Sequence, residues 1–148
     1  MSPAPSSPDV SPPAPDEEVR SELAGRCDTI EEAYEFFLAY ASQGLPSDQG
    51  SETGRQVREY LRRCDAALTR IGDLIIGVIE RAGLDQAPYR AFVGVIERDA
   101  RDASAVIQLV LAQPAIGSQL VDNLNASIHL RALLTDLFLI DEALKLHK

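Results

Sequence analysis

The sequence of 148 residues contains no tryptophan, one methionine, two cysteines and two histidines. Two cysteines are too few for the disulfide framework of a small secreted domain. The patterns C-x-x-C, H-E-x-x-H and Glu-x-x-His are absent, and the residues three before the two histidines are Ala126 and Leu144. We therefore expect no metal and no cofactor of the kinds that these patterns hold.

The chain also lacks phosphate-binding glycine motifs, a basic tract and any long uncharged apolar run. Its formal charge is −9, and residues 1–50 carry ten acidic against two basic side chains. Such a chain has no cationic surface for nucleic acid or anionic lipid. The absence of an apolar segment of signal-peptide or membrane-spanning type favours a cytoplasmic protein with no nucleic-acid and no membrane partner.

What the sequence does contain is apolar side chains at helical spacing. Between residues 57 and 82 they recur at intervals of four and three, which places them on one face of a helix. A second stripe with the same spacing runs from Tyr89 to Val110. We predict long helices over residues 52–82, 86–113 and 118–146. The first stripe consists of Val57, Leu61, Cys64, Leu68, Ile71, Ile75, Val78 and Ala82.

The N-terminal part reads differently. Residues 1–15 hold six of the nine prolines and predict a disordered Pro/Ser/Ala-rich tail. A capping box formed by Thr29 and Glu32 predicts a helix over 29–43, and residues 16–24 predict a short helix that ends at Gly25.

Residues 16–148 together are long enough for one core and are predicted to form a single helical-bundle domain. Short connections favour antiparallel neighbours. The predicted fold is all-α: an antiparallel up-and-down bundle of three long helices plus one shorter N-terminal helix. The glycines inside the predicted helices, Gly72, Gly77 and Gly94, mark either a close approach of another backbone or merely tolerant sites.

The last predicted helix is more apolar than a bundle helix needs to be. Plotted at about 100° per residue, its apolar side chains cover about 240° of the circumference. Either this helix contacts the most neighbours, or the excess is a surface for self-association. The candidate interaction surface consists of Leu130, Leu133, Leu137, Phe138, Leu139 and Ile140.

Two charges fall inside apolar faces. Asp99 lies in the apolar arc of the helix predicted over 86–113, and Arg131 lies in that of the following helix. A hairpin centred near residue 115 would place them opposite each other, which predicts a partly buried ion pair. The alternative is that one or both reach to the rim. A buried pair in a bundle can also line a pocket, so a small-molecule ligand near Asp99 and Arg131 stays an alternative.

Four arginines lie near the start of the helix predicted over 52–82, where cations oppose the helix dipole. The nearest anions are three glutamates on the outer face of the helix predicted over 29–43. We expect the two groups to pair, and an acidic partner or ligand is the alternative. The groups are Arg55, Arg58, Arg62 and Arg63, and Glu31, Glu32 and Glu35.

The remaining reactive side chains give weak signals. His129 could serve as a phosphoacceptor, but histidine phosphotransfer domains have a lysine three residues after the histidine and usually a glycine next, where this chain has Ala132 and Leu133. An ordinary histidine on a polar stripe fits better. Cys64 lies on the apolar stripe and is predicted to be buried, whereas Cys27 precedes a predicted helix N-terminus, which would lower its pKa.

No catalytic constellation emerges from these residues. The sequence favours a non-enzymatic bundle that acts through protein contacts, as an adaptor, scaffold or regulatory subunit. We expect it to form homodimers or to bind a protein partner. The alternatives are a ligand-binding or enzymatic bundle with its pocket near Asp99 and Arg131, and histidine phosphotransfer through His129.

Overall fold

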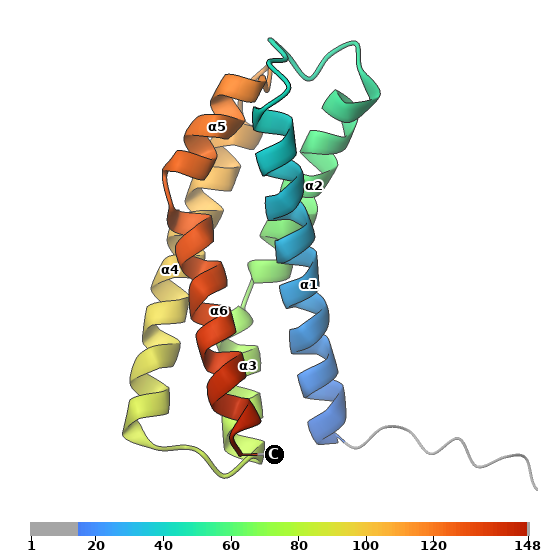
Figure 1. Ribbon diagram of the computed structural model, residues 1–148. Coiled ribbons are helices and arrows are strands. Elements are labelled where there is room, and N and C mark those ends of the chain that lie inside the picture. The colour runs from blue at the N-terminus through green and yellow to red at the C-terminus, as the bar shows by residue number, and fades with distance from the viewer. Residues whose placement is uncertain (1–14, 148) are drawn as a thin grey trace, which may run out of the picture.

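The computed structural model describes residues 15–147. In that range the chain forms helices joined by turns and loops and contains no strand (Figure 1). None of the helices in this part of the chain combines the length and the apolar character needed to cross a membrane. The helices are α1 (Pro15–Ala41), α2 (Glu52–Leu68), α3 (Ile71–Arg81), α4 (Ala87–Leu111), α5 (Ser118–Ala126) and α6 (His129–Lys145).

The six helices form four columns that run alternately in opposite directions (Figure 1). Helix α1 is the first column, α2 and α3 follow end to end as the second, α4 is the third, and α5 and α6 form the fourth. Both α1 and α4 pack against each of the two divided columns. The start of α1, the α3–α4 turn and the end of α6 lie at one end of the bundle, and the α1–α2 loop and the α4–α5 turn lie at the other (Figure 1).

The N-terminal helix differs from the prediction because it is a single helix of 27 residues rather than two short ones. Thr29 does not act as a cap; its hydroxyl donates to the carbonyl of Gly25 within the helix, at 3.0 Å. Gly25 costs about 1 kcal/mol of helix propensity. Burial of Leu23 and Ile30 on either side of it offsets that cost. The predicted tail of residues 1–15 lies outside the described residues except for Pro15, where α1 begins.

The helix predicted over 52–82 is interrupted at Thr69 and Arg70. Thr69 is extended, and Arg70 is left-handed with φ 58°. The interruption leaves backbone carbonyls free, and side chains bind two of them: Arg26 donates to the carbonyl of Thr69, and the Thr69 hydroxyl donates to that of Asp65. The stripe is nevertheless buried along both halves, with Leu68 and Ile71 in the core on either side of the break.

The helix predicted over 118–146 is interrupted at Ser127 and Ile128. Ile128 has φ 63°, a conformation that a β-branched residue adopts only under strain, and its side chain is 60% exposed. The Ser127 hydroxyl donates to the carbonyl of Leu124 at 2.6 Å, which satisfies the end of α5. Helix α6 then restarts at His129.

The core confirms most of the predicted stripes. From Val57 to Val78 every stripe position is buried, and only Ala82 is partly exposed. On α4, six of the stripe residues are buried, while Tyr89 is partly exposed. The largest fully buried side chains include two from α1, Phe37 and Tyr40, so the N-terminal helix is a full member of the core.

Of the three glycines singled out from the sequence, only Gly72 has a neighbour closer than 3.0 Å to an added Cβ, and that neighbour is a side chain rather than another backbone. A Cβ at Gly72 would lie 2.4 Å from Cγ of Glu97 on α4. At Gly77 and Gly94 a Cβ would come no nearer than 3.0 Å and 3.7 Å, to arginine side-chain ends. These two positions are therefore tolerant sites.

Candidate functional site

Asp99 and Arg131 do not form the predicted ion pair. Arg131 is exposed, and the ion pairs within residues 15–147 do not include it. Asp99 lies half-buried on α4 and contacts a different residue of α6, Asp136, five positions further along the chain. The register of α4 against α6 therefore differs from that of an uninterrupted hairpin.

The contact between Asp99 and Asp136 brings two carboxyl groups together. Oδ2 of Asp136 is buried and receives no hydrogen bond. Burial, and then the neighbouring Asp99 carboxyl, raise the pKa of Asp136 to about 7. This pair could not be predicted from the sequence, because Asp136 lies on the polar stripe with His129 when the last helix is plotted as continuous.

The candidate interaction surface on the last helix divides into two groups. Four of its six residues are at most 3% exposed and belong to the core: Leu130, Leu133, Leu137 and Ile140. Phe138 is 48% exposed and Leu139 is 58% exposed. Of the candidate interaction surface, only these two neighbours are therefore exposed, and we call them the α6 patch.

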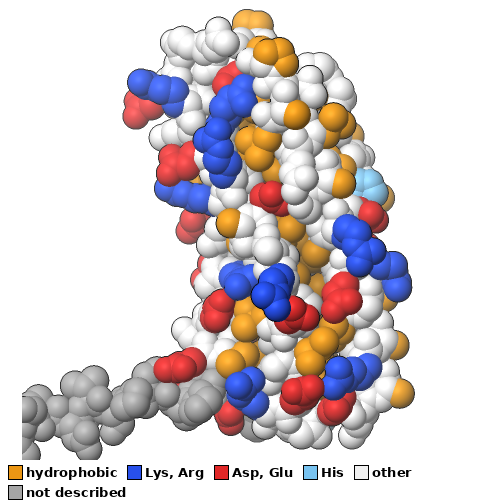
Figure 2. All heavy atoms as spheres, turned by 180° about the vertical axis from the view of Figure 1, so that it is seen from behind, with side chains coloured by type: hydrophobic (Ala, Val, Ile, Leu, Met, Phe, Trp, Pro, Cys, Tyr) orange, Lys and Arg blue, Asp and Glu red, His pale blue; other side chains and the backbone are white. Residues whose placement is uncertain are grey.

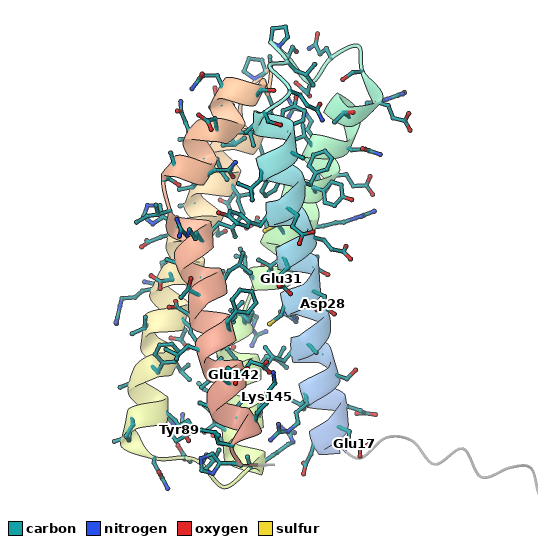
Figure 3. All side chains as sticks on the ribbon, viewed as in Figure 1. Glu17, Asp28, Glu31, Tyr89, Glu142 and Lys145 are labelled. Atoms are coloured by element: carbon teal, nitrogen blue, oxygen red, sulfur yellow. The ribbon has the colours of Figure 1, made fainter. Side chains whose placement is uncertain are left out.

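Next to the α6 patch, α4 and α6 enclose an apolar notch of about 160 Å³. It lies toward the end of the bundle where α4 begins and α6 ends, near the labelled Tyr89 and Glu142 in Figure 3. The Tyr89 hydroxyl and Nε2 of His147 lie 3.2 Å apart at that end. The notch is lined by Pro88, Tyr89, Phe92, Leu139, Ile140 and Ala143.

Among the four arginines near the start of α2, Arg58 has a partner that sequence reasoning missed. Its Nε donates to Oδ2 of Asp48 at 2.6 Å, and its two Nη atoms donate to the carbonyls of Leu111, Gln113 and Pro114. These carbonyls lie at and just beyond the end of α4, where the helix dipole is negative. The positive charge of Arg58 is therefore balanced by the carboxylate of Asp48 in the α1–α2 loop and by the negative C-terminal end of α4.

The other expected pairs with Glu31, Glu32 and Glu35 do not appear among the ion pairs of residues 15–147. Arg63 pairs with Glu59 on its own helix and lies over the Tyr60 ring. Arg55 and Arg62 are exposed.

Asp48 is the centre of a polar cluster that ties the α1–α2 loop to the α4–α5 turn. The residue is 7% exposed, and its Oδ1 accepts a 2.7 Å hydrogen bond from the backbone N–H of Ile116. Burial alone would raise the pKa of Asp48, but the Arg58 and Ile116 hydrogen bonds hold it below its ordinary value. The charge is thus fully compensated, as a buried carboxylate requires.

Tyr40 and Ser118 complete the polar cluster. The Tyr40 hydroxyl donates to the carbonyl of Ile116 at 2.6 Å, and the Ser118 hydroxyl donates to the carbonyl of Tyr40 at 2.7 Å. The Leu45 N–H donates to the Ser118 hydroxyl oxygen, while the Ser118 N–H donates back to Leu45. Every group in this cluster bonds to the protein itself, which is typical of a structural tie.

Of the two predictions about the cysteines, the burial of Cys64 is confirmed and the lowered pKa of Cys27 is not. Cys64 is fully buried, as predicted, and burial raises its pKa to about 12. Cys27 lies inside α1 rather than before a helix, and burial followed by the charges of Asp141, Asp28 and Glu31 raises its pKa to about 11. The expectation of a lowered pKa at Cys27 is therefore wrong, since the helix start that would have lowered it lies twelve residues earlier.

His129, the candidate phosphoacceptor, is the first residue of α6 and is half-buried. No group of three or more His, Cys, Asp or Glu side chains suited to a metal ion occurs within the described range.

A surface hollow lies where α2 passes into α3 and faces α4. It measures about 680 Å³ and is wide open, and its lining includes Arg70, Glu97 and Arg101 but neither Asp99 nor Arg131. Figure 2 shows the face formed by α2, α3 and α4, with hydrophobic side chains along the line between the columns and charges of both signs on either side. The Glu97 side chain already lies over Gly72 at the start of α3. A carboxylate of the protein thus occupies the end of the helix that would attract an anion.

Two arrangements therefore stand out for function: the α6 patch with its notch, and the carboxyl pair on the same α4–α6 side. Comparisons of the chain with protein-family models, with curated proteins and with solved structures find no match.

Proposed function

We propose that this protein is a non-enzymatic helical bundle that acts through protein contacts and associates with a second copy of itself through the α6 patch. The observation that carries the proposal is the exposure of two adjacent large apolar side chains, Phe138 and Leu139, beside an apolar notch. A single exposed leucine is ordinary on a protein surface, but a pair that continues into a concave apolar site is typical of a docking surface.

A symmetric arrangement fits this surface. In a two-fold dimer the same patch serves both copies, so a protruding Phe138 could enter the notch of the partner. Burying the exposed half of each side chain contributes about 1 kcal/mol, and the dimer buries four such side chains, or about 4 kcal/mol. A free energy of that size corresponds to about a thousandfold in the dissociation constant.

The cytoplasm is the proposed place of action. Both cysteines are free thiols in the structure, and thiols persist in reducing compartments.

Sedimentation of the wild-type chain and of a Phe138→Ser, Leu139→Ser double variant tests the proposal. The wild type is expected to dimerise, and the dimer dissociation constant of the double variant is expected to be about a thousandfold higher than that of the wild type. Leu109→Ser is the matched control, because Leu109 is 64% exposed on α4 and does not line the notch. A wild-type chain that remains monomeric at every concentration, or a control that dissociates as readily as the double variant, would refute self-association through this patch.

A further inference from the structure

The two carboxyl groups on the α4–α6 side pose a chemical problem. Asp99 and Asp136 come from different helices, both side chains are half-buried, and they are in contact. An ionised carboxylate only accepts hydrogen bonds, so two ionised groups in contact repel each other. One proton between them converts the same contact into a hydrogen bond from an acid to a carboxylate, which is among the stronger kinds.

Within residues 15–147, no cation pairs with either aspartate. Helix α6 packs against α4, α1 and α5. From α4 the group that faces Asp136 is Asp99, and no charged side chain of α1 or α5 acts on the Asp136 carboxyl. Arg98, Arg101 and Arg131 are exposed nearby in sequence, but neither aspartate forms an ion pair within the described residues.

We infer that Asp99 and Asp136 form a proton-operated latch, in which a shared proton holds α6 against α4 and its loss loosens the contact between the two helices. The buried Oδ2 of Asp136, which receives no hydrogen bond from any donor in the described residues, is where the shared proton would lie.

The break at Ser127–Ile128 makes α6 the element that can respond. Because α5 and α6 are separate helices joined by a strained left-handed residue, α6 can shift against α4 without unwinding a continuous helix. The α6 patch begins two residues after Asp136, yet the latch does not depend on self-association, since both carboxyls belong to one chain.

The direction of the pH effect follows from the pKa values. The pKa of Asp136 is raised to about 7 in the folded protein, first by burial and then by Asp99, whereas it is about 4 in an unfolded chain. The folded state therefore binds the proton more tightly than the unfolded state. The contribution of the latch is fully present below about pH 4, falls as the pH rises toward 7, and is lost above that.

Carboxyl-carbon NMR of the wild-type chain tests the latch, with Asp136→Asn used to assign the signal. One aspartate signal, absent from spectra of Asp136→Asn, is expected to titrate near pH 7. Titration of the Asp136 carboxyl near its ordinary value of about 4 would overturn the inference.

Chemical unfolding at fixed protein concentration supplies the second readout. Relative to Asp136→Asn, the wild-type unfolding constant is expected to rise by about tenfold to a hundredfold between pH 5 and pH 8, because the pKa of Asp136 is about 7 in the folded protein and about 4 in the unfolded chain. The asparagine amide can donate to Asp99 without a charge, so this variant keeps the contact at every pH.

Asp102→Asn is the matched control, because Asp102 is exposed on α4 three residues after Asp99. It should follow the wild-type pH profile. Wild type and Asp136→Asn that change in parallel from pH 5 to pH 8 would overturn the latch, whatever the oligomeric state of the protein.

Discussion

The Asp48–Arg58 pair allows a sharp test of how burial changes the value of an ion pair. Its side chains are 8% and 24% exposed, whereas those of Glu59 and Arg63, a carboxylate–guanidinium pair that lies wholly on α2, are 58% and 54% exposed. Substituting Asp48→Ala leaves the Arg58 guanidinium without its anion and the Ile116 N–H without its acceptor. Breaking a buried pair in this way costs about 3 to 5 kcal/mol.

For Asp48→Ala we expect a loss of stability at the lower end of that range. Arg58 is still partly exposed and keeps its hydrogen bonds to carbonyls beyond α4, so about 3 kcal/mol is the expected loss in the free energy of unfolding. Glu59→Ala should cost less than about 0.5 kcal/mol, because exposed pairs one helical turn apart contribute little. Asp48→Asn should fall between the two, since its amide oxygen can still accept from Ile116.

Urea unfolding monitored by circular dichroism measures these differences. The pH dependence adds a second check: the pKa of Asp48 is lowered in the folded protein, so its contribution is present above about pH 4 and is lost as the pH falls through the folded value. The gap between wild type and Asp48→Ala should therefore narrow in acid. Equal costs for Asp48→Ala and Glu59→Ala at neutral pH would refute the reasoning from burial.

Three further outcomes are expected. Gly25→Ala should stabilise the protein by about 1 kcal/mol in urea unfolding, because nothing lies within 4 Å of the added Cβ. Gly54→Ala should destabilise it by more than that, because its Cβ would lie 2.0 Å from the backbone oxygen of Asp48, and a gain in stability would contradict the packing there. Cys27 should react slowly with a disulfide reagent at pH 8, because its pKa is about 11, and the rate should rise tenfold per pH unit. A rate that levels off below pH 9 would contradict this.

The sequence was a good guide wherever burial repeats at helical spacing. The stripe from Val57 to Val78 is buried as predicted, and the class of fold follows from it. It was a poor guide to the polar cluster, because Asp48 lies in a loop and meets Ile116 across 68 positions of the chain. Local patterns carry no information on a contact that depends on how two loops meet at one end of a bundle.

The two helix breaks affected the predicted core in different ways, because one preserves the phase of the buried residues and the other changes it. Neither break contains glycine or proline, so neither has the usual signal in the sequence. Across Thr69–Arg70 the buried residues keep the same phase at about 100° per residue, and the predicted stripe therefore remains correct although the helix is divided. A break that preserves phase changes the backbone but not the list of core residues.

The break at Ser127–Ile128 does change the phase. Plotted on one continuous helix, the buried residues of α5 and those of α6 fall on faces about 180° apart, and together they produce the arc of about 240° that suggested a surplus of apolar surface. In that plot Arg131 lies on the buried face of α5, but the restarted helix turns it to solvent and brings Asp136 to the edge of the core instead. The false ion pair and the excess surface thus have one cause. An apolar arc much wider than half a circumference, on a helix with no room for that many neighbours, is better read as two helices joined by a change of phase.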